Sequence, residues 1–366
     1  SGCENKDSIT IEDAIAKAIE IKKNDATSVV VIEIQAGEYA LKSPIQITPE
    51  LNGLKIQGRG ANDVSIKGSV PVNVEWKKYT DNILVASIED GLEFDQFLVD
   101  GKAQIMARYP NYDENGGHWQ GHTSDAISAE RVATWKNPKS AIVHAMHSGE
   151  WGGFHYKAVG VDSIGNLTLK YGHQNNRPSK MHPKYRMVEN VFEELDSAGE
   201  WFLDGNTLYF WPSKNINLEK AKVEVVTQKH LLEIVGTEEK PVVNVKVEGI
   251  KFEHSQRTLF EEYEPLLRSD WTIYRGGAVV IEGTKNVSIN NCEFTNLGGN
   301  VIMVSNYNRG TTITNNHIHD CGATAISFVG NPSAVRSPSF QYSEFVPLAE
   351  MDTVRGPKNN NYPSKA

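Results

Sequence analysis

Carboxylate, aromatic and guanidinium side chains lie close together in the stretch 256–275. Glu264 and Asp270 are followed by Trp271 and then by Arg275. Hydrolysis of a glycosidic bond requires two carboxyl groups, one as acid and one as nucleophile or base, and sugar rings pack well on aromatic faces. We therefore predict Glu264 and Asp270 as catalytic residues, with Trp271 and Arg275 as substrate-binding residues. The alternative is a solvated acidic loop.

Two histidines alternate with an apolar residue in His317-Ile318-His319, and Asp320 follows them. If Ile318 points into a core, both imidazoles point outward on one face, because side chains alternate along a strand. Such a pair could bind a ligand, transfer protons or hold a metal, so His319 and Asp320 join the catalytic candidates. The alternatives are an exposed pair at a strand end and an aspartate that only satisfies turn amides.

A third group of polar residues lies in the middle of the chain. The stretch 147–155 combines histidines, a glutamate, a tryptophan and glycines, whereas 172–187 is basic and contains no acidic residue. Planar guanidinium groups bind carboxylate and sulfate groups in a bidentate manner. We therefore predict that Trp151, His155 and Arg177 bind substrate. A basic surface loop that pairs with nearby glutamates is the alternative.

The linear sequence contains no spacing typical of a zinc site, a phosphate loop or a Ser-His-Asp nucleophile. No metal-binding residues and no cofactor are therefore predicted. Calcium stays open as a ligand, because Asp and Asn residues that are far apart in the sequence can meet in space.

The elements that position these residues repeat along the chain. The segment 286–302 aligns with 310–326 at an offset of 24 residues, and an earlier copy, 245–252, aligns at an offset of 42, as if an 18-residue loop were inserted. The coinciding apolar pairs are Ile289 with Ile313, Phe294 with Ile318, Leu297 with Cys321 and Ile302 with Ile326. Repeats of short alternating apolar runs are typical of stacked coils. We predict an all-β fold, a right-handed parallel β-helix, with these side chains buried.

Other patterns predict how the rest of the chain is organised. Apolar residues in 11–21 follow the helical period behind Thr10 as N-cap, and such a helix would cap the first coil. The repeat then disappears, and strand-like runs are separated by turns such as Asp100-Gly101. The predicted segments are a cap with the first coils at 1–70, an inserted antiparallel β-rich domain at 71–226, β-helix coils at 227–330 and an irregular proline-rich segment at 331–366.

Composition excludes some classes of function. The net charge of -9 disfavours non-specific nucleic-acid binding, and no apolar run has the length of a membrane span. Cys292 and Cys321 occupy different positions in the repeat, so we predict free thiols. Ser1-Gly2-Cys3 is what a bacterial lipoprotein signal leaves behind, with Cys3 as a lipid anchor; the alternative is a chance occurrence.

The chain resembles a group of right-handed β-helix carbohydrate-active enzymes in three segments, 97–111, 199–212 and 264–277. These enzymes have the pectate-lyase-like fold. They are of the glycoside hydrolase type and are found in polysaccharide-degrading Bacteroidota. The resemblance implies a polysaccharide or oligosaccharide substrate and adds Arg309 to the substrate-binding candidates. Members of this group usually continue for several more coils. The chain therefore resembles a member truncated at its C-terminus, with part of the catalytic apparatus in later coils. We expect the segment 331–366 to cover the last coil only in part, which predicts that the polypeptide self-associates or belongs to a longer protein.

These features together predict a polysaccharide-degrading enzyme, a glycoside hydrolase with paired carboxylates. One continuous groove should lie where the insertion meets the coils, lined by Trp151, His155, Arg177, Trp271 and Arg275. Two alternatives stay open, a lyase acting on uronic-acid glycans and a non-catalytic glycan-binding or structural β-helix. The expected location is extracytoplasmic, in the periplasm or on the outer-membrane surface.

Overall fold

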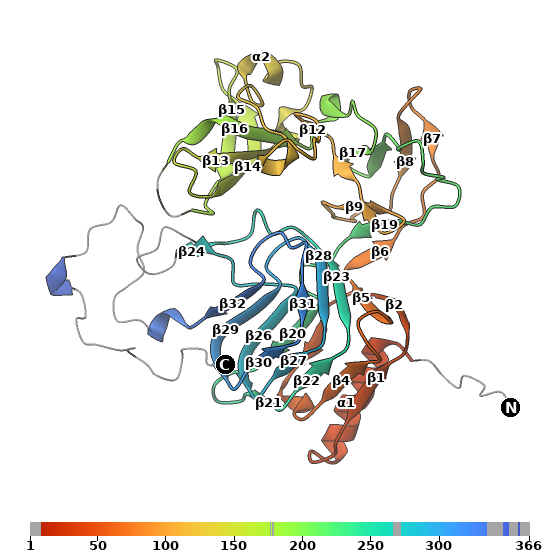
Figure 1. Cartoon of the computed structure of the whole chain (residues 1–366), viewed down its shortest axis with the longest axis vertical. Coiled ribbons are helices and arrows are strands. Elements are labelled where there is room, and N and C mark those ends of the chain that lie inside the picture. Colours follow the sequence, from red (N-terminus) through yellow and green to blue (C-terminus); the bar gives the residue numbers. More distant parts are fainter. Residues whose placement is uncertain are drawn as a thin grey trace.

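Short parallel strands stack on three faces of the molecule, as Figure 1 shows. The computed structural model describes residues 9–175, 177, 179–265, 272–334, 347–350 and 358. In each of the three faces, strands from successive coils pair in parallel, so backbone hydrogen bonds run between coils. The predicted all-β solenoid of parallel strands is confirmed.

The strands of the coils form three sheets. Sheet 1 contains β1 (Val31–Ile34), β4 (Lys55–Gly58), β22 (Lys246–Glu248), β27 (Ser288–Asn290) and β30 (Thr312–Thr314). Sheet 2 contains β2 (Gly37–Ala40), β5 (Val64–Lys67), β23 (Lys251–Ser255), β28 (Glu293–Leu297) and β31 (His317–Ile318). Sheet 3 contains β3 (Ile45–Ile47), β20 (Leu232–Val235), β26 (Val279–Lys285), β29 (Ile302–Arg309) and β32 (Ile326–Val329), and β21 (Val242–Val243) pairs with β26.

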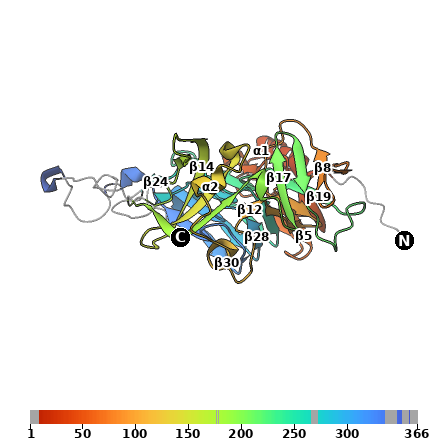
Figure 2. The same ribbon diagram turned by 90° about the horizontal axis from the view of Figure 1, so that it is seen from above.

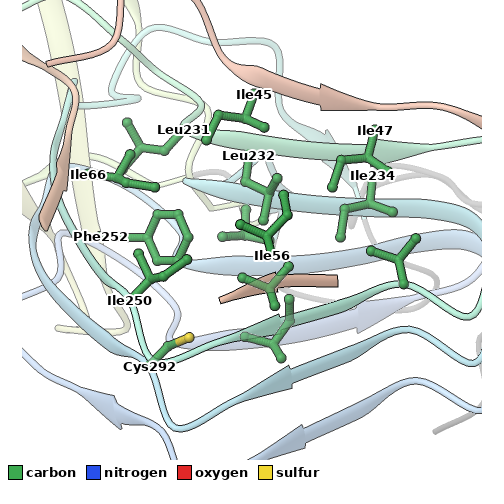
Figure 3. Packing of buried hydrophobic residues seen from close by; sticks show 14 of the residues in the cluster. Ile45, Ile47, Ile56, Ile66, Leu231, Leu232, Ile234, Ile250, Phe252 and Cys292 are labelled. Carbon is green, nitrogen blue, oxygen red and sulfur yellow. The ribbon is translucent and has the colours of Figure 1, made fainter. Parts of the chain in front are cut away.

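The register of the coils is the one that the repeat predicts. Parallel pairing places Ile289 beside Ile313, Phe294 beside Ile318 and Ile302 beside Ile326, and Leu297 forms a bridge with Cys321. Phe252 pairs with Phe294 across the predicted offset of 42, because the loop after β23 lengthens that coil. Figure 3 shows Ile66 and Phe252, register partners in neighbouring coils, in the same apolar interior.

Burial follows the position of a residue in the stack. Ile289, Phe294 and Ile302 are fully buried, as predicted. Ile313 and Ile318 are only half-buried, and Ile326 is 39% exposed, so the prediction of burial is wrong for Ile326. These three side chains belong to β30, β31 and β32, the outermost described coil, and pack against one neighbouring coil instead of two.

The predicted capping helix is present as α1 (Ile11–Asn24). The Thr10 hydroxyl accepts a hydrogen bond from the Asp13 amide at 3.1 Å, which satisfies one of the free N–H groups of the first turn. Ile15 and Ile19 pack against the apolar interior of the coils, so the helix covers apolar surface of the first coil.

The turns between sheets 2 and 3 differ greatly in length from coil to coil. The chain passes from β28 to β29 through residues 298–301, whereas the preceding coil inserts residues 256–278 at the same turn. One coil earlier, the chain between β5 and β20 forms a separate set of strands, residues 69–226, which we call the insertion. Both long segments therefore leave the coils at one edge. Figure 1 shows the insertion above that edge, and in Figure 2, seen from above, the insertion overlaps the coils.

The insertion contains three sheets of largely antiparallel strands. Sheet 4 contains β10 (Lys102–Ala103), β9 (Phe97–Val99), β19 (Val223–Val226) and β6 (Ser69–Pro71). Sheet 5 contains β11 (Ile105–Met106), β17 (Glu200–Asp204), β18 (Thr207–Phe210), β8 (Leu84–Ser87) and β7 (Lys77–Lys78). Sheet 6 contains β12 (Arg108–Tyr109), β16 (Met181–Glu189), β13 (Ile142–His147), β14 (Gly153–Val161) and β15 (Leu167–Tyr171).

Short helices and one small ribbon complete the described structure. The ribbon pairs β24 (Glu264–Pro265) with β25 (Thr272–Ile273) in the long loop. The helices are α2 (Ala129–Val132), η1 (Pro49–Leu51), η2 (His118–Gln120), η3 (Pro138–Ser140), η4 (Phe192–Glu194), η5 (Pro332–Ala334) and η6 (Leu348–Glu350). No described helix has the length and apolar composition of a membrane span.

Cysteine chemistry follows the prediction where the chain is described. Cys292 and Cys321 are both free, the first buried and the second half-buried. Burial raises the pKa of the Cys292 thiol to about 11, which keeps it protonated and unreactive at neutral pH. Cys3, the predicted lipid anchor, lies outside the described residues.

Glu200 in β17 should make stability depend on pH. Its side chain is 1% exposed, and burial raises its pKa from 4.5 to about 8. The folded protein therefore retains a proton that the unfolded chain releases, so the contribution of Glu200 to the free energy of unfolding should fall between about pH 4.5 and 8. Glu200→Gln cannot ionise and should remove this decline in urea unfolding measured across that range. Parallel pH profiles for the two proteins would contradict the prediction.

Candidate functional site

A short segment of the insertion bridges sheet 6 and the long loop of the coils. Gln174 accepts a hydrogen bond from the His155 amide at 3.0 Å, and its own amide donates to the Leu259 carbonyl at 2.7 Å. Its neighbour His173 bonds through Nε2 to the Glu261 carbonyl at 2.9 Å. The insertion and the loop therefore make one connected structure at the edge of the coils, which we call the junction.

An exposed aromatic platform lies at the insertion side of the junction. Trp151 is 51% exposed, although His147 stacks on it with ring centroids 5.3 Å apart and an angle of 19°. The Arg177 guanidinium carbon lies 4.5 Å from the centroid of the Trp151 ring, and the Asn175 amide donates to the Trp151 carbonyl at 2.8 Å. Trp151 and Arg177, two of the predicted substrate-binding residues, are therefore in direct contact.

A hydrogen-bonded pair of imidazoles lies on two neighbouring strands of sheet 6, β13 and β14. His144 Nδ1 lies 2.7 Å from His155 Nδ1, and His144 Nε2 lies 3.0 Å from a carboxylate oxygen of Glu189. Burial and the neighbouring His144 lower the pKa of His155 to about 3, so His155 is neutral at neutral pH. No hydrogen bond joins its Nε2 to a described residue.

His155, His144 and Glu189 form a hydrogen-bonded chain that we call the relay. Its proton positions decide what His155 offers to a ligand. A carboxylate only accepts, so His144 Nε2 donates to Glu189. If His144 is neutral, its Nδ1 accepts from His155, and Nε2 of His155 presents a lone pair. If His144 is protonated, it donates through Nδ1, and Nε2 of His155 presents an N–H group. The relay can thus present either a base or a hydrogen-bond donor.

An ion pair holds the far end of the relay to the coils. Arg257, which follows β23, donates through Nη1 to Glu189 at 2.5 Å and through Nε to Asp95 at 2.8 Å. Burial alone would raise the pKa of Glu189, but the charges of Arg257 and His144 hold that pKa well below its ordinary range. Glu189 is therefore a buried carboxylate whose charge is compensated from both sides.

A second tryptophan approaches the relay on a tightly held loop. The Arg108 guanidinium donates to the carbonyls of Pro110, Trp119 and Gly121 at 2.9, 2.6 and 2.9 Å. This places the Trp119 ring 6.1 Å from the His144 ring, centroid to centroid. Sequence reasoning missed Trp119 because the Arg108 guanidinium positions it through hydrogen bonds to backbone carbonyl groups. No pattern of side chains along the sequence reveals such bonds.

Sequence reasoning also missed His144, Glu189 and Arg257. One local feature could have indicated His144, since it lies in the otherwise largely buried strand β13, where a polar side chain needs a partner. Glu189 and Arg257 are 68 residues apart in the sequence, and their pairing depends on how the insertion rests on the coils.

On the loop side, Glu264 and Arg275 form an ion pair. Arg275 Nη2 lies 2.7 Å from Glu264 Oε1, and Nε of the same guanidinium donates to that oxygen at 2.8 Å. Arg275 also donates to the Ser305 hydroxyl at 3.1 Å and to the Gly330 carbonyl at 2.9 Å. Arg275 therefore positions Glu264 against the coils. Asp270 and Trp271 lie outside the described residues, so their pairing with Glu264 and a groove shared with Trp151 stay predictions.

The remaining predicted site residues lie elsewhere on the coils. Arg309 ends β29, at the opposite end of that strand from the junction, and its guanidinium carbon is 4.7 Å from the Tyr307 ring centroid. His319 follows β31 in sheet 2 and contacts Asp320 at 2.7 Å and Glu293 at 3.3 Å. Hydrogen bonds to Asp320 and Glu293 raise the pKa of His319.

Asp320 has the backbone role that the repeat suggests. Its φ is 49°, and the aligned Asn296 has a φ of 52°, a left-handed conformation that Asn and Asp tolerate better than most residues. Its carboxylate is nevertheless directed at the His319 ring, so the residue serves both as a turn residue and as a hydrogen-bond acceptor.

A hollow of about 730 Å³ lies apart from all of these residues. It opens between β7, β8 and the segment before β19, and it is lined mainly by aliphatic and small side chains. None of the predicted site residues lines it. The junction, which combines the platform, the relay and the Glu264–Arg275 pair, is therefore the stronger candidate site.

Comparison with known proteins agrees with the geometry of the coils. A family model described as "Right handed beta helix region" matches residues 195–346. A solved structure titled "Glycoside hydrolase" superposes on 93% of this chain with a TM-score of 0.71 and 19% sequence identity. The chain is a right-handed parallel β-helix. It covers 66% of the length of that glycoside hydrolase.

Other comparisons add little to the β-helix assignment. A structure titled "The complex structure of XylC with xylose" matches at a TM-score of 0.42 and 11% identity, over 89% of this chain and 49% of the other. That TM-score is too low to indicate a common fold. None of the curated proteins matches the sequence significantly.

Proposed function

We propose that this β-helix is a polysaccharide-degrading enzyme of the glycoside hydrolase type and that it binds its substrate at the junction. The observation that carries the proposal is the exposed Trp151, which contacts the His147 ring and the Arg177 guanidinium, in an insertion that also holds the relay ending at His155. An aromatic face flanked by planar donors suits a sugar ring, whose C–H face is apolar and whose edge is polar. The shared fold with a glycoside hydrolase supports this proposal.

The carboxyl groups of the proposed reaction come from the loop. In hydrolysis one carboxylic acid protonates the leaving oxygen, while a carboxylate attacks the sugar or activates water. Glu264 is the described candidate, and Asp270 is its proposed partner. His155 would hydrogen-bond a hydroxyl of the bound sugar, as donor or acceptor according to the proton position in the relay.

A specific observation favours a lyase as the second candidate. A lyase removes a proton next to a uronate carboxylate, so it needs a base together with a cation that neutralises the carboxylate. His155, which presents a lone pair when His144 is neutral, and Arg177, a guanidinium that contacts Trp151, supply these two types of group within the insertion. Calcium, which the sequence leaves open as a ligand, would fit such a substrate.

The product distinguishes the candidates. The protein would be incubated with neutral, uronic-acid-containing and sulfated polysaccharides, and both reducing ends and ultraviolet absorbance would be followed. New reducing ends without absorbance support the hydrolase, and absorbance from a new double bond supports the lyase. Binding without any product would leave a non-catalytic glycan-binding β-helix, and the absence of both would refute the proposal.

Trp151→Ala should weaken oligosaccharide binding at least tenfold, about 1.4 kcal/mol, because it removes the platform on which the sugar stacks. Trp151→Phe keeps an aromatic face and should retain most of the affinity. Isothermal titration with the best oligosaccharide measures both. Equal affinities for the Ala variant and the unaltered protein would show that Trp151 is not part of the binding site.

A further inference from the structure

A cluster of metal-ligating side chains lies on the outward face of sheet 2, independent of the proposed function. Glu293 of β28 and His317 of β31 are register partners, and His319 follows two residues later on the same face. The His317 and His319 rings lie with centroids 4.3 Å apart. One ligand atom from each of Glu293, His317 and His319 can be chosen so that all three lie within 4.8 Å of one another.

We propose that Glu293, His317 and His319 bind a divalent transition-metal ion, with Zn²⁺ as the representative ion. Two ligands bound at about 2.0–2.1 Å to a tetrahedral ion are separated by roughly 3.3 Å. His319 Nε2 and Glu293 Oε1 are 3.3 Å apart, the separation that such an ion requires. His317 supplies the third ligand, because its side chain is exposed and its ligand atom lies within 4.8 Å of the other two.

Asp320 orients one of the ligands. Its carboxylate accepts a hydrogen bond from His319 Nδ1 at 2.7 Å, which turns the Nε2 atom of that ring toward Glu293. A carboxylate behind a ligating imidazole fixes the ring and increases its basicity, and such partners are typical of protein metal sites. Asp320 is thus a positioning residue. A bound ion would take the place of the proton between His319 and Glu293.

The donor set selects the class of metal. Two imidazole nitrogens and one carboxylate oxygen suit zinc and its neighbours, whereas calcium and magnesium prefer oxygen ligands throughout. The ligands also come from two coils, since Glu293 belongs to β28 and the histidines belong to the next coil. A bound ion would therefore tie the outermost described coil, whose Ile318 is only half-buried, to the coil before it.

The test is a titration of the metal-free, tag-free protein with zinc chloride by isothermal calorimetry. We expect one ion per chain and at least a tenfold loss of affinity in His317→Ala, His319→Ala and Glu293→Gln. Zinc should raise the thermal midpoint of the unaltered protein but not of these variants, and calcium should leave it unchanged. Asp320→Asn should weaken zinc binding by about 10–100-fold while keeping the stoichiometry.

A matched control distinguishes a built site from surface histidine binding. His230 lies 2.7 Å from Glu233 with similar exposure, but no second histidine among the described residues joins this pair in a metal-ligating group, so His230→Ala should bind zinc normally. Circular dichroism in chelator should be the same for all variants, since the altered side chains are at the surface. Unchanged zinc affinity in the His317 and His319 variants, or an equal loss in His230→Ala, would overturn the proposal.

Discussion

Phe294→Ala should lower the free energy of unfolding by about 3–5 kcal/mol. Phe294 is fully buried in the fourth coil and stacks on Phe252 of the coil before it, with ring centroids 5.2 Å apart and an angle of 8°. Ile318 of the next coil pairs with it on the other side. Removal of the ring leaves a cavity between coils that stacked strands cannot close without loss of register.

Urea unfolding followed by circular dichroism measures this effect. Phe328→Ala is the matched control, because Phe328 lies in β32 of the same solenoid but is 43% exposed. It should cost about 1 kcal/mol or less. Similar losses in the two variants would mean that the stacked interior is not the main source of stability in these coils.

Arg257→Met should destabilise the protein by about 3–5 kcal/mol, because it leaves Glu189 as a buried charge with one partner fewer. The Glu189 side chain is only 9% exposed, and Arg257 supplies its closest contact. Asp95 loses a partner in the same variant. The loss should appear in urea unfolding at neutral pH, where Glu189 is ionised.

A double-mutant cycle isolates the ion pair. Glu189→Gln removes the charge, so Arg257→Met in that background should cost clearly less than it does alone. The lowered pKa of Glu189 adds stability above its ordinary unfolded pKa, and this stability is lost as the pH falls. The Arg257 variant should show a weaker acid-dependent loss.

An exposed ion pair provides the comparison. Lys78 pairs with Asp81 at 2.7 Å, and their side chains are 69% and 93% exposed. Lys78→Met should change stability by about 1 kcal/mol at most, because water screens such pairs. If Arg257→Met costs no more than Lys78→Met, the Glu189 charge is not compensated by Arg257.

The coils could be predicted from the sequence because their contacts repeat at a nearly fixed interval. Each coil places its apolar residues directly on those of the coil before it, so the 24-residue alignment of Ile289 with Ile313 also predicts a spatial contact. The same logic located the loop between Phe252 and Phe294, whereas the N-cap at Thr10 followed from the local pattern of a helix start. Burial departed from the pattern in the outermost described coil, where Ile326 is exposed and Ile313 and Ile318 are only half-buried, because burial depends on the number of neighbouring coils.

The candidate site could be predicted only in part. Trp151 and Arg177 were identifiable as single residues with suitable chemistry, and the structure places them in contact. The relay from His155 through His144 to Glu189 and Arg257 was decided by tertiary structure alone. It joins three strands of the insertion, β14, β13 and β16, to a loop of the coils, and no periodicity relates these four segments. Buried polar groups must find partners wherever the fold brings them, so their pairing follows from packing and not from spacing along the chain.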